Sequence, residues 1–179
     1  MKQLALFKLI SLVLITNAEA QVNPIHKGLG CGLQVIQYQK DFGIGLNATG
    51  PYFANDRIAI RARVNMVFNE HLKNGTITWT PYSNASLGII GVAGYVGDFI
   101  KLYGEGGMIW LFPSADFSSK EFMLGGYGLF GFEFYMNNSN CYFLEIGGVG
   151  TGATADLVST KPIYSNGLII SAGFRLHKK

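Results

Sequence analysis

The sequence is poor in the residues that build several familiar classes of protein. Its 179 residues include 2 cysteines, 3 histidines and 5 prolines, and only 14% of them are charged. Two cysteines are too few for a disulfide-built scaffold, and a net charge of +3 is too small to indicate nucleic-acid binding. A soluble domain carries about 25% charged residues, so the low charge content is unusual for a soluble surface.

The few histidines and cysteines show no spacing typical of a metal site. His26 precedes the first predicted strand, His71 lies in a predicted loop and His177 lies in the terminal tail. We therefore predict no catalytic residue, no cofactor and no metal site. Cys31 and Cys141 are predicted to be separate thiols, with a disulfide as the alternative if their Cα atoms lie within about 7 Å.

Long apolar runs are also scarce beyond the first 20 residues. The longest uncharged run, 76–97, contains Pro81 and several polar residues, and its second half has four regularly spaced glycines. No segment after residue 20 therefore looks like a membrane-spanning helix. An apolar exported chain without such a helix has one other way to satisfy its backbone in lipid, which is a closed β-barrel.

The amino-terminal segment is typical of a secretory signal peptide. Two lysines precede or interrupt an apolar core at 4–15, and Ala18-Glu19-Ala20 places small residues at the −3 and −1 positions of a cleavage site. We predict a signal peptide over 1–20, cleaved before Gln21. An N-terminal membrane anchor is the weaker alternative, because the apolar stretch is short for a span of about 20 residues.

Alternation is the strongest feature of the remaining chain. From Ile58 to Phe68 every even position is apolar, whereas the odd positions from Arg57 to Asn69 include three arginines and two asparagines. A period of two places these groups on opposite faces of a β-strand. A helix would spread the three arginines around its circumference.

The same pattern recurs along the chain and predicts eight strands. Their expected bounds are Gly28–Gln37, Asp41–Thr49, Arg57–Asn69, Asn84–Tyr95, Phe99–Phe112, Glu121–Met136, Cys141–Thr151 and Ile163–Leu176. Short connections alternate with longer ones, which predicts both termini and the short turns in the periplasm and the longer loops outside. We predict an all-β fold, an eight-stranded antiparallel up-and-down transmembrane β-barrel of one domain, residues 21–179, preceded by the cleaved signal peptide.

A period of two does not by itself say which face lies inside. We assign the apolar face to the outside, because it is rich in aromatic residues and lies opposite many glycines. Aromatic residues near the strand ends would form girdles at the membrane interfaces; these are Tyr52, Phe53, Tyr95, Phe99, Trp110, Phe112, Phe122, Tyr135, Tyr142 and Tyr164. The alternative is a soluble lipocalin-like ligand-binding barrel, whose apolar face would point inward.

With the apolar face outside, the inward faces carry charges of both signs. This predicted lumen network consists of Arg61, Arg63, Lys101, Glu105, Glu133, Glu145 and Arg175. The acids lie on three successive strands, and an eight-stranded barrel is just wide enough for side chains to fill it. We predict that acids and bases pair across the lumen and plug it, as a structural network rather than an ion path, and that the barrel is not a wide porin.

The longest predicted external loop, Glu70–Ser83, carries Trp79 and Tyr82. Aromatic residues are typical of contact surfaces, so this loop is a candidate for binding a host or surface ligand. An equally good interpretation is that 70–83 simply extends the third hairpin.

On these features the chain resembles the small eight-stranded outer-membrane barrels of the OmpX, OmpA-barrel and opacity-protein kind. The resemblance extends from about residue 22 to the end, and includes the closing segment 167–176. Members usually end on an aromatic residue, whereas here the nearest candidate is Phe174. The resemblance implies the outer membrane of a Gram-negative-type bacterium, with outer-membrane lipid and the barrel-assembly machinery as partners. It also implies roles that range from envelope stability to adhesion and resistance to host defences.

We therefore expect an integral outer-membrane β-barrel with a structural or surface-interaction role, and no enzyme. A membrane-embedded lipid-modifying enzyme, an acyl hydrolase or transferase, is the alternative. Such chemistry needs a base near a nucleophile and an acid, and His71 beside Glu70 is the only conceivable start for it in the sequence.

Overall fold

A computed structural model describes residues 28–73, 75–137 and 139–178. The predicted signal peptide over 1–20, its cleavage before Gln21, and His26 lie outside the described residues. No helix in the described part of the chain is long and apolar enough to cross a membrane.

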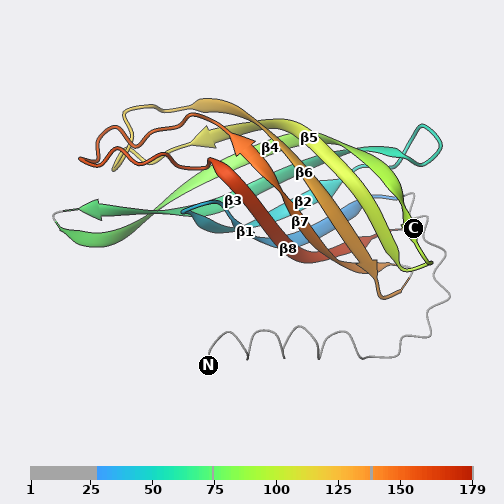
Figure 1. Ribbon diagram of the computed structural model, residues 1–179. Helices are drawn as coiled ribbons and strands as arrows, with labels where there is room; N and C mark the ends of the chain where they lie inside the picture. Colours follow the sequence, from blue (N-terminus) through green and yellow to red (C-terminus); the bar gives the residue numbers. More distant parts are fainter. Residues whose placement is uncertain (1–27, 74, 138, 179) are drawn as a thin grey trace, which may run out of the picture.

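Eight strands follow one another in chain order and close into a ring (Figure 1). They are β1 (Gly30–Gln37), β2 (Phe42–Thr49), β3 (Ile58–Lys73), β4 (Thr76–Val96), β5 (Ile100–Phe112), β6 (Met123–Tyr135), β7 (Asn140–Gly150) and β8 (Gly167–His177). Each strand pairs antiparallel with the next, and β8 pairs with β1 to close the ring. The predicted all-β fold of eight antiparallel strands is confirmed.

The period of two decides which side chains lie inside the ring. On β3, the Arg61 side chain is fully buried, whereas its neighbours Ile60 and Ala62 are exposed on the outer face. The same alternation turns Leu33, Ile89 and most other large apolar strand residues outward. The structure therefore has its apolar face outside, and the lipocalin-like arrangement with an apolar face inside is wrong.

The predicted loop at 70–83 is wrong, because this segment belongs to the two longest strands. β3 and β4 stay paired from Asn69↔Thr80 to Lys73↔Thr76, and the chain reverses beside Gly75, whose φ is +78°. The loop was predicted because 70–83 is rich in polar residues, but in the structure these residues still alternate with outward apolar residues. The interpretation as an extension of the third hairpin is confirmed.

The connections gather at two ends of the barrel. The longer segments between β5 and β6 and between β7 and β8 lie at one end, together with the projecting tip of β3 and β4 (Figure 1). The carboxyl terminus and the connections that follow β2, β4 and β6 lie at the opposite end. We call these the loop end and the terminus end.

The aromatic residues divide between the two faces of the wall. Phe53, Phe99 and Phe122 are exposed, as a girdle requires, but Tyr52, Tyr135 and Tyr164 are buried. The girdle prediction is wrong for these three tyrosines, because each hydroxyl hydrogen-bonds a partner inside the barrel. A tyrosine near a strand end can thus belong to either face.

Candidate functional site in the barrel interior

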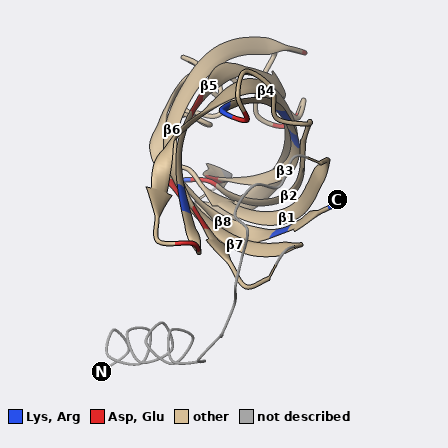
Figure 2. Cartoon of the chain, turned by 90° about the vertical axis from the view of Figure 1, so that its right-hand side faces the viewer, with Lys and Arg blue, Asp and Glu red and all other residues tan. Residues whose placement is uncertain are grey.

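The structure brings all seven residues of the predicted lumen network together inside the barrel. We call them the charge cluster: Arg61, Arg63, Lys101, Glu105, Glu133, Glu145 and Arg175, all of them buried. They come from β3, β5, β6, β7 and β8. Figure 2 looks into the barrel from the terminus end and shows acidic and basic residues distributed around its wall.

The two arginines of β3 bridge carboxylates of two other strands. Arg61 Nη1 donates to Glu105 Oε2 at 2.9 Å and to Glu145 Oε1 at 3.1 Å. Arg63 Nη2 donates to the same Glu105 oxygen at 2.6 Å, and its Nη1 donates to Glu145 Oε2 at 2.8 Å. Two carboxylates are thus held by the same two guanidinium groups, which suits the forked geometry of arginine.

Glu133 is the second centre of the charge cluster. Its Oε1 accepts from Arg61 at 3.2 Å and also from Arg175, while its Oε2 accepts from Tyr135 at 2.7 Å and lies 2.5 Å from Lys101 Nζ. These four donors use the full accepting capacity of a carboxylate. A buried charge is costly unless it is paired in this way.

Tyrosines and glycines complete the packing around these charges. Tyr103 donates to Glu145 Oε1 at 2.5 Å, and Tyr127 donates to Glu105 Oε1 at 2.7 Å. A Cβ atom at Gly131 would overlap the ring of Tyr103, and one at Gly88 would overlap the hydroxyl of Tyr127. Glycine is therefore favoured at both positions, because the wall must leave room for these two tyrosine side chains.

The arrangement of the charge cluster favours structure over chemistry. Its carboxylates are occupied by guanidinium, ammonium and hydroxyl donors, so none is poised to take a proton from a substrate. General-base catalysis needs a group within hydrogen-bond reach of the substrate, whereas these groups are buried against one another.

A second cluster fills the interior at the loop end, and no pattern in the sequence predicted it. The buried carboxylate of Asp41 accepts from Tyr82 OH at 2.9 Å, from Asn69 Nδ2 at 2.8 Å and from the backbone N–H of Ser165 at 2.8 Å. The rings of Tyr82, Phe117 and Tyr164 pack edge to face at centroid distances of 5.1–5.8 Å. We call these residues, Asp41, Asn69, Tyr82, Phe117, Tyr164 and Ser165, the loop-end cluster.

No cation balances Asp41 within the hydrogen-bonded part of the loop-end cluster. Burial raises the pKa of the Asp41 carboxyl, and the hydrogen bonds from Ser165, Asn69 and Tyr82 only partly oppose this. Burial also raises the pKa of the nearby Tyr38 hydroxyl to about 12, so this hydroxyl stays protonated at neutral pH. The loop-end cluster is thus held by hydrogen bonds from neutral donors and by ring contacts around one desolvated acid.

The two candidate contact residues lie on opposite faces of β4. Trp79 is 44% exposed on the outer face and packs against Phe42 at a centroid distance of 5.4 Å. Tyr82 is 5% exposed and points into the loop-end cluster. Tyr82 is therefore wrong as an external contact residue, because the strand at this point continues the alternation that the predicted loop would have ended.

The candidate pair for lipid-modifying chemistry is separated in the same way. His71 is buried inside β3, whereas Glu70 is exposed on the outer face. Adjacent strand residues point to opposite faces, so this carboxylate cannot orient this imidazole. The prediction that His71 lies in a loop is also wrong, because it lies in β3 and packs near Phe117.

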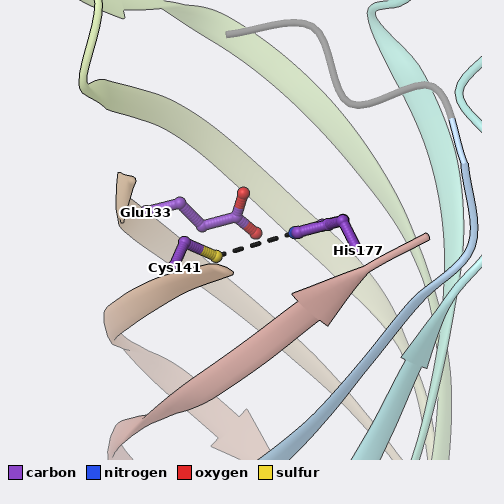
Figure 3. Close-up of side chains that lie close together, drawn as sticks. All are labelled: Glu133, Cys141 and His177. Carbon is purple, nitrogen blue, oxygen red and sulfur yellow. Dashed lines mark hydrogen bonds between the residues drawn. The ribbon is translucent and has the colours of Figure 1, made fainter. Parts of the chain in front are cut away.

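A third group of side chains meets at the terminus end, where the sequence predicted no cluster of ligands. Glu133, Cys141 and His177 are buried, and one ligand atom of each lies within 4.8 Å of the others (Figure 3). His177 is the last residue of β8 rather than part of a tail. The alternation of β8 could have shown this, since Arg175 and His177 share the inward face.

Both cysteines are free thiols, as predicted. Cys31 is exposed on the outer face of β1, whereas Cys141 is buried on the inner face of β7. The barrel wall therefore separates the two sulfur atoms.

The comparisons with known proteins support the fold alone. No protein-family model and no curated protein matches the sequence. Among solved structures, the chain is similar to the N-terminal β-barrel domain of OprF from Pseudomonas aeruginosa, with a TM-score of 0.60 and 12% identity over 86% of this chain and 98% of that one. The resemblance to small eight-stranded outer-membrane barrels is thus confirmed for the architecture.

Proposed function

We propose that this chain is an integral outer-membrane β-barrel protein with a closed interior and a structural role in the envelope. The observation that carries the proposal is the distribution of residues across the wall. Large apolar side chains cover the outside, while the charges are paired inside the ring. A ring without a free edge also leaves no strand backbone unpaired in lipid.

The outer surface over β1, β2, β3, β7 and β8 supports contact with lipid. A shallow groove of about 920 Å³ runs there, lined mainly by apolar side chains, among them Leu33, Ile44, Val64 and Phe174. An acyl chain can fill such a groove without leaving polar groups unsatisfied.

Membrane placement is tested by fractionating cells that express the chain. We expect the protein in the outer-membrane fraction, and a faster-migrating band when the sample is not boiled before electrophoresis. Recovery in the soluble fraction, without detergent, would exclude the membrane role. Signal-peptide cleavage before Gln21 and delivery by the barrel-assembly machinery are parts of the same proposal, tested by the amino-terminal sequence of the membrane form.

The closed interior predicts a poor channel. The charge cluster spans the lumen from β3 to β6 and β7, and the loop-end cluster fills the interior beyond it. Purified protein in planar bilayers should give no steady conductance of porin size. Stable open-channel currents of that size would overturn the plugged interior while leaving the membrane placement intact.

A second candidate function is surface contact through the tip of the β3–β4 hairpin. Within the described residues, 69–73 and 76–80 pair only with each other, because β2 ends its pairing at Phe68 and β5 ends its pairing at Ser83. Outward Leu72, Ile77 and Trp79 make this free ribbon apolar. Exposed strand edges of this kind are templates for pairing with another chain.

The contact role is tested on whole cells. Deleting 71–78 should abolish binding of the cells to host matrix or host cells, because the free ribbon is lost. Trp79→Ala should weaken that binding, and Phe122→Ala is the matched control, because Phe122 is also exposed on the outer surface but is not part of the ribbon. Unchanged binding after deletion would remove the contact role and leave the structural role.

A further inference from the structure

Cys141 and His177 come together at the terminus end from two paired strands. Cys141 opens the inner face of β7, and His177 closes the inner face of β8. Cys141 Sγ lies 3.6 Å from His177 Nε2, and the two side chains point toward each other (Figure 3). They are 0% and 4% exposed, so their geometry is set by the wall of the barrel.

The separation of these atoms is close to that around a single bridging metal ion. Typical metal–sulfur and metal–nitrogen bonds of about 2.3 and 2.0 Å allow the two ligand atoms to lie up to about 4.3 Å apart, and about 3.5 Å apart at a tetrahedral angle. With two ligands alone an ion prefers the longer, nearly linear arrangement, so the sulfur and nitrogen atoms, 3.6 Å apart, would have to separate by about 0.7 Å to hold it. Gly30 leaves room for the imidazole, since a Cβ atom there would press on His177.

Glu133 is close to both atoms but is not available as a third ligand. Its four accepting positions are taken by Arg61, Arg175, Lys101 and Tyr135. A metal ion could bind Glu133 only by displacing one of these donors and leaving it unsatisfied in the interior. The site is therefore a two-ligand site of one thiolate and one imidazole.

The charges of the charge cluster favour a monovalent over a divalent ion at this site. The charge cluster has four bases and three acids, so its fixed charges already leave a positive excess near the site. A divalent ion would add to this excess in a buried place. A monovalent ion that replaces the thiol proton leaves the total charge of the interior unchanged.

We propose that Cys141 and His177 bind one soft monovalent metal cation of the Cu⁺ type. Thiolate is the soft ligand that selects Cu⁺, and imidazole also suits copper. On binding, the S–H bond breaks, the sulfur and Nε2 each bond to the ion, and one proton leaves to solvent. The site is independent of the structural and contact roles proposed above, since it needs only the folded barrel.

The experiment uses the purified full-length protein in detergent micelles, with Cu⁺ kept reduced by ascorbate and competed against bicinchoninate. All measurements are made on Cys31→Ser, which removes the exposed thiol on the outside of the wall. We expect one Cu⁺ per barrel and one proton released. Added Cys141→Ser should abolish this binding, and added His177→Gln should weaken it by more than about tenfold, because even outer-shell partners contribute that much to metal affinity.

Three results would overturn the site. These are no binding to Cys31→Ser, equal binding after Cys141→Ser, or equal binding after His177→Gln. Each variant is first shown to fold by its migration without boiling. If a double variant does not fold, X-ray absorption of copper-loaded Cys31→Ser decides the question without it: one sulfur and one nitrogen neighbour support the site, and only oxygen or nitrogen neighbours exclude it.

Discussion

Two regions fill the barrel interior, and different parts of the chain hold them. In the charge cluster, every ion pair joins residues of strands, for example Arg63 of β3 and Glu145 of β7. In the loop-end cluster, Tyr82 of β4 meets Phe117 and Ser165, which lie in the connections between strands. The ladder of backbone hydrogen bonds holds every member of the first region, but in the second it holds only Asn69 and Tyr82.

Because of this difference, we expect the charge cluster to control the stability of the whole barrel and the loop-end cluster to control only the opening of its connecting segments. When an ion pair of the charge cluster is broken, the remaining charge stays buried as long as the ring is closed. The loss therefore lowers the free energy of unfolding of the whole barrel. The loop-end cluster can instead open when its connecting segments lift away, and the ring below it stays paired. Segments with few backbone hydrogen bonds to neighbouring strands open locally at a low free-energy cost.

The largest effect is expected from Glu133→Gln. Gln keeps the shape but loses the charge that balances Lys101, Arg61 and Arg175, and breaking a buried pair costs about 3–5 kcal/mol. Urea titrations of the barrel in vesicles should show this loss in the free energy of unfolding. Glu70→Gln, on the exposed face of β3, is the control and should change it by less than about 0.5 kcal/mol.

Phe117→Ala tests the other region. Removing a fully buried ring should cost about 3 kcal/mol. We expect this loss mainly in the free energy of local opening of the segments 113–122 and 151–166, and not in that of global unfolding. Limited proteolysis should therefore cut these segments faster, while the unboiled band persists on a gel. Phe130→Ala, an exposed ring on β6 outside both segments, should leave the cutting rate unchanged. If Phe117→Ala lowers global stability as much as Glu133→Gln, the two regions are not separable.

Gly131→Ala tests the fit within the charge cluster. The added methyl group would overlap the ring of Tyr103, and overpacking of this kind costs about 1–3 kcal/mol. Gly128→Ala on the same strand is the control, because its Cβ would make an ordinary contact with the backbone oxygen of Glu105 at 4.0 Å. Equal stability of the two variants in urea would contradict the tight fit.

The smallest effect is a pH dependence of the loop-end cluster. Burial raises the pKa of Asp41, so the folded chain holds this proton at a pH where the unfolded chain has released it. The contribution of Asp41 to stability is therefore greatest below the unfolded pKa and is lost as pH rises through the folded pKa. Urea titrations from pH 3 to pH 8 should show wild type gaining stability over Asp41→Asn as pH falls. A difference that does not vary with pH would exclude a raised pKa.

The sequence predicted the charge cluster because strands leave a period in the sequence. Arg61 and Arg63, two positions apart, had to share a face, and closing eight strands brought that face opposite Glu105 and Glu145. The position of every strand was predicted to within a few residues except where β3 and β4 extend past their neighbours. There the polar residues between Glu70 and Ser83 resembled a loop.

The loop-end cluster could not be predicted, because it depends on segments without a period. Phe117 and Ser165 meet Tyr82 only through the path of their connections, and nothing in their spacing records that path. Cys141 and His177 were missed for a different reason. The strand β8 runs one residue further than predicted, and that residue is His177.

The positions of the charges along the chain have a consequence for assembly. The charge cluster needs Arg61 from the third strand and Arg175 from the last, and Glu133 between them binds both. In the proposed membrane role, a sheet that entered lipid strand by strand would lack Arg175, one of the four donors to Glu133, until β8 arrived. Assembly should therefore favour a nearly complete ring that closes at the β1–β8 seam before it meets lipid, with the late arrival of Arg175 acting as a check on register.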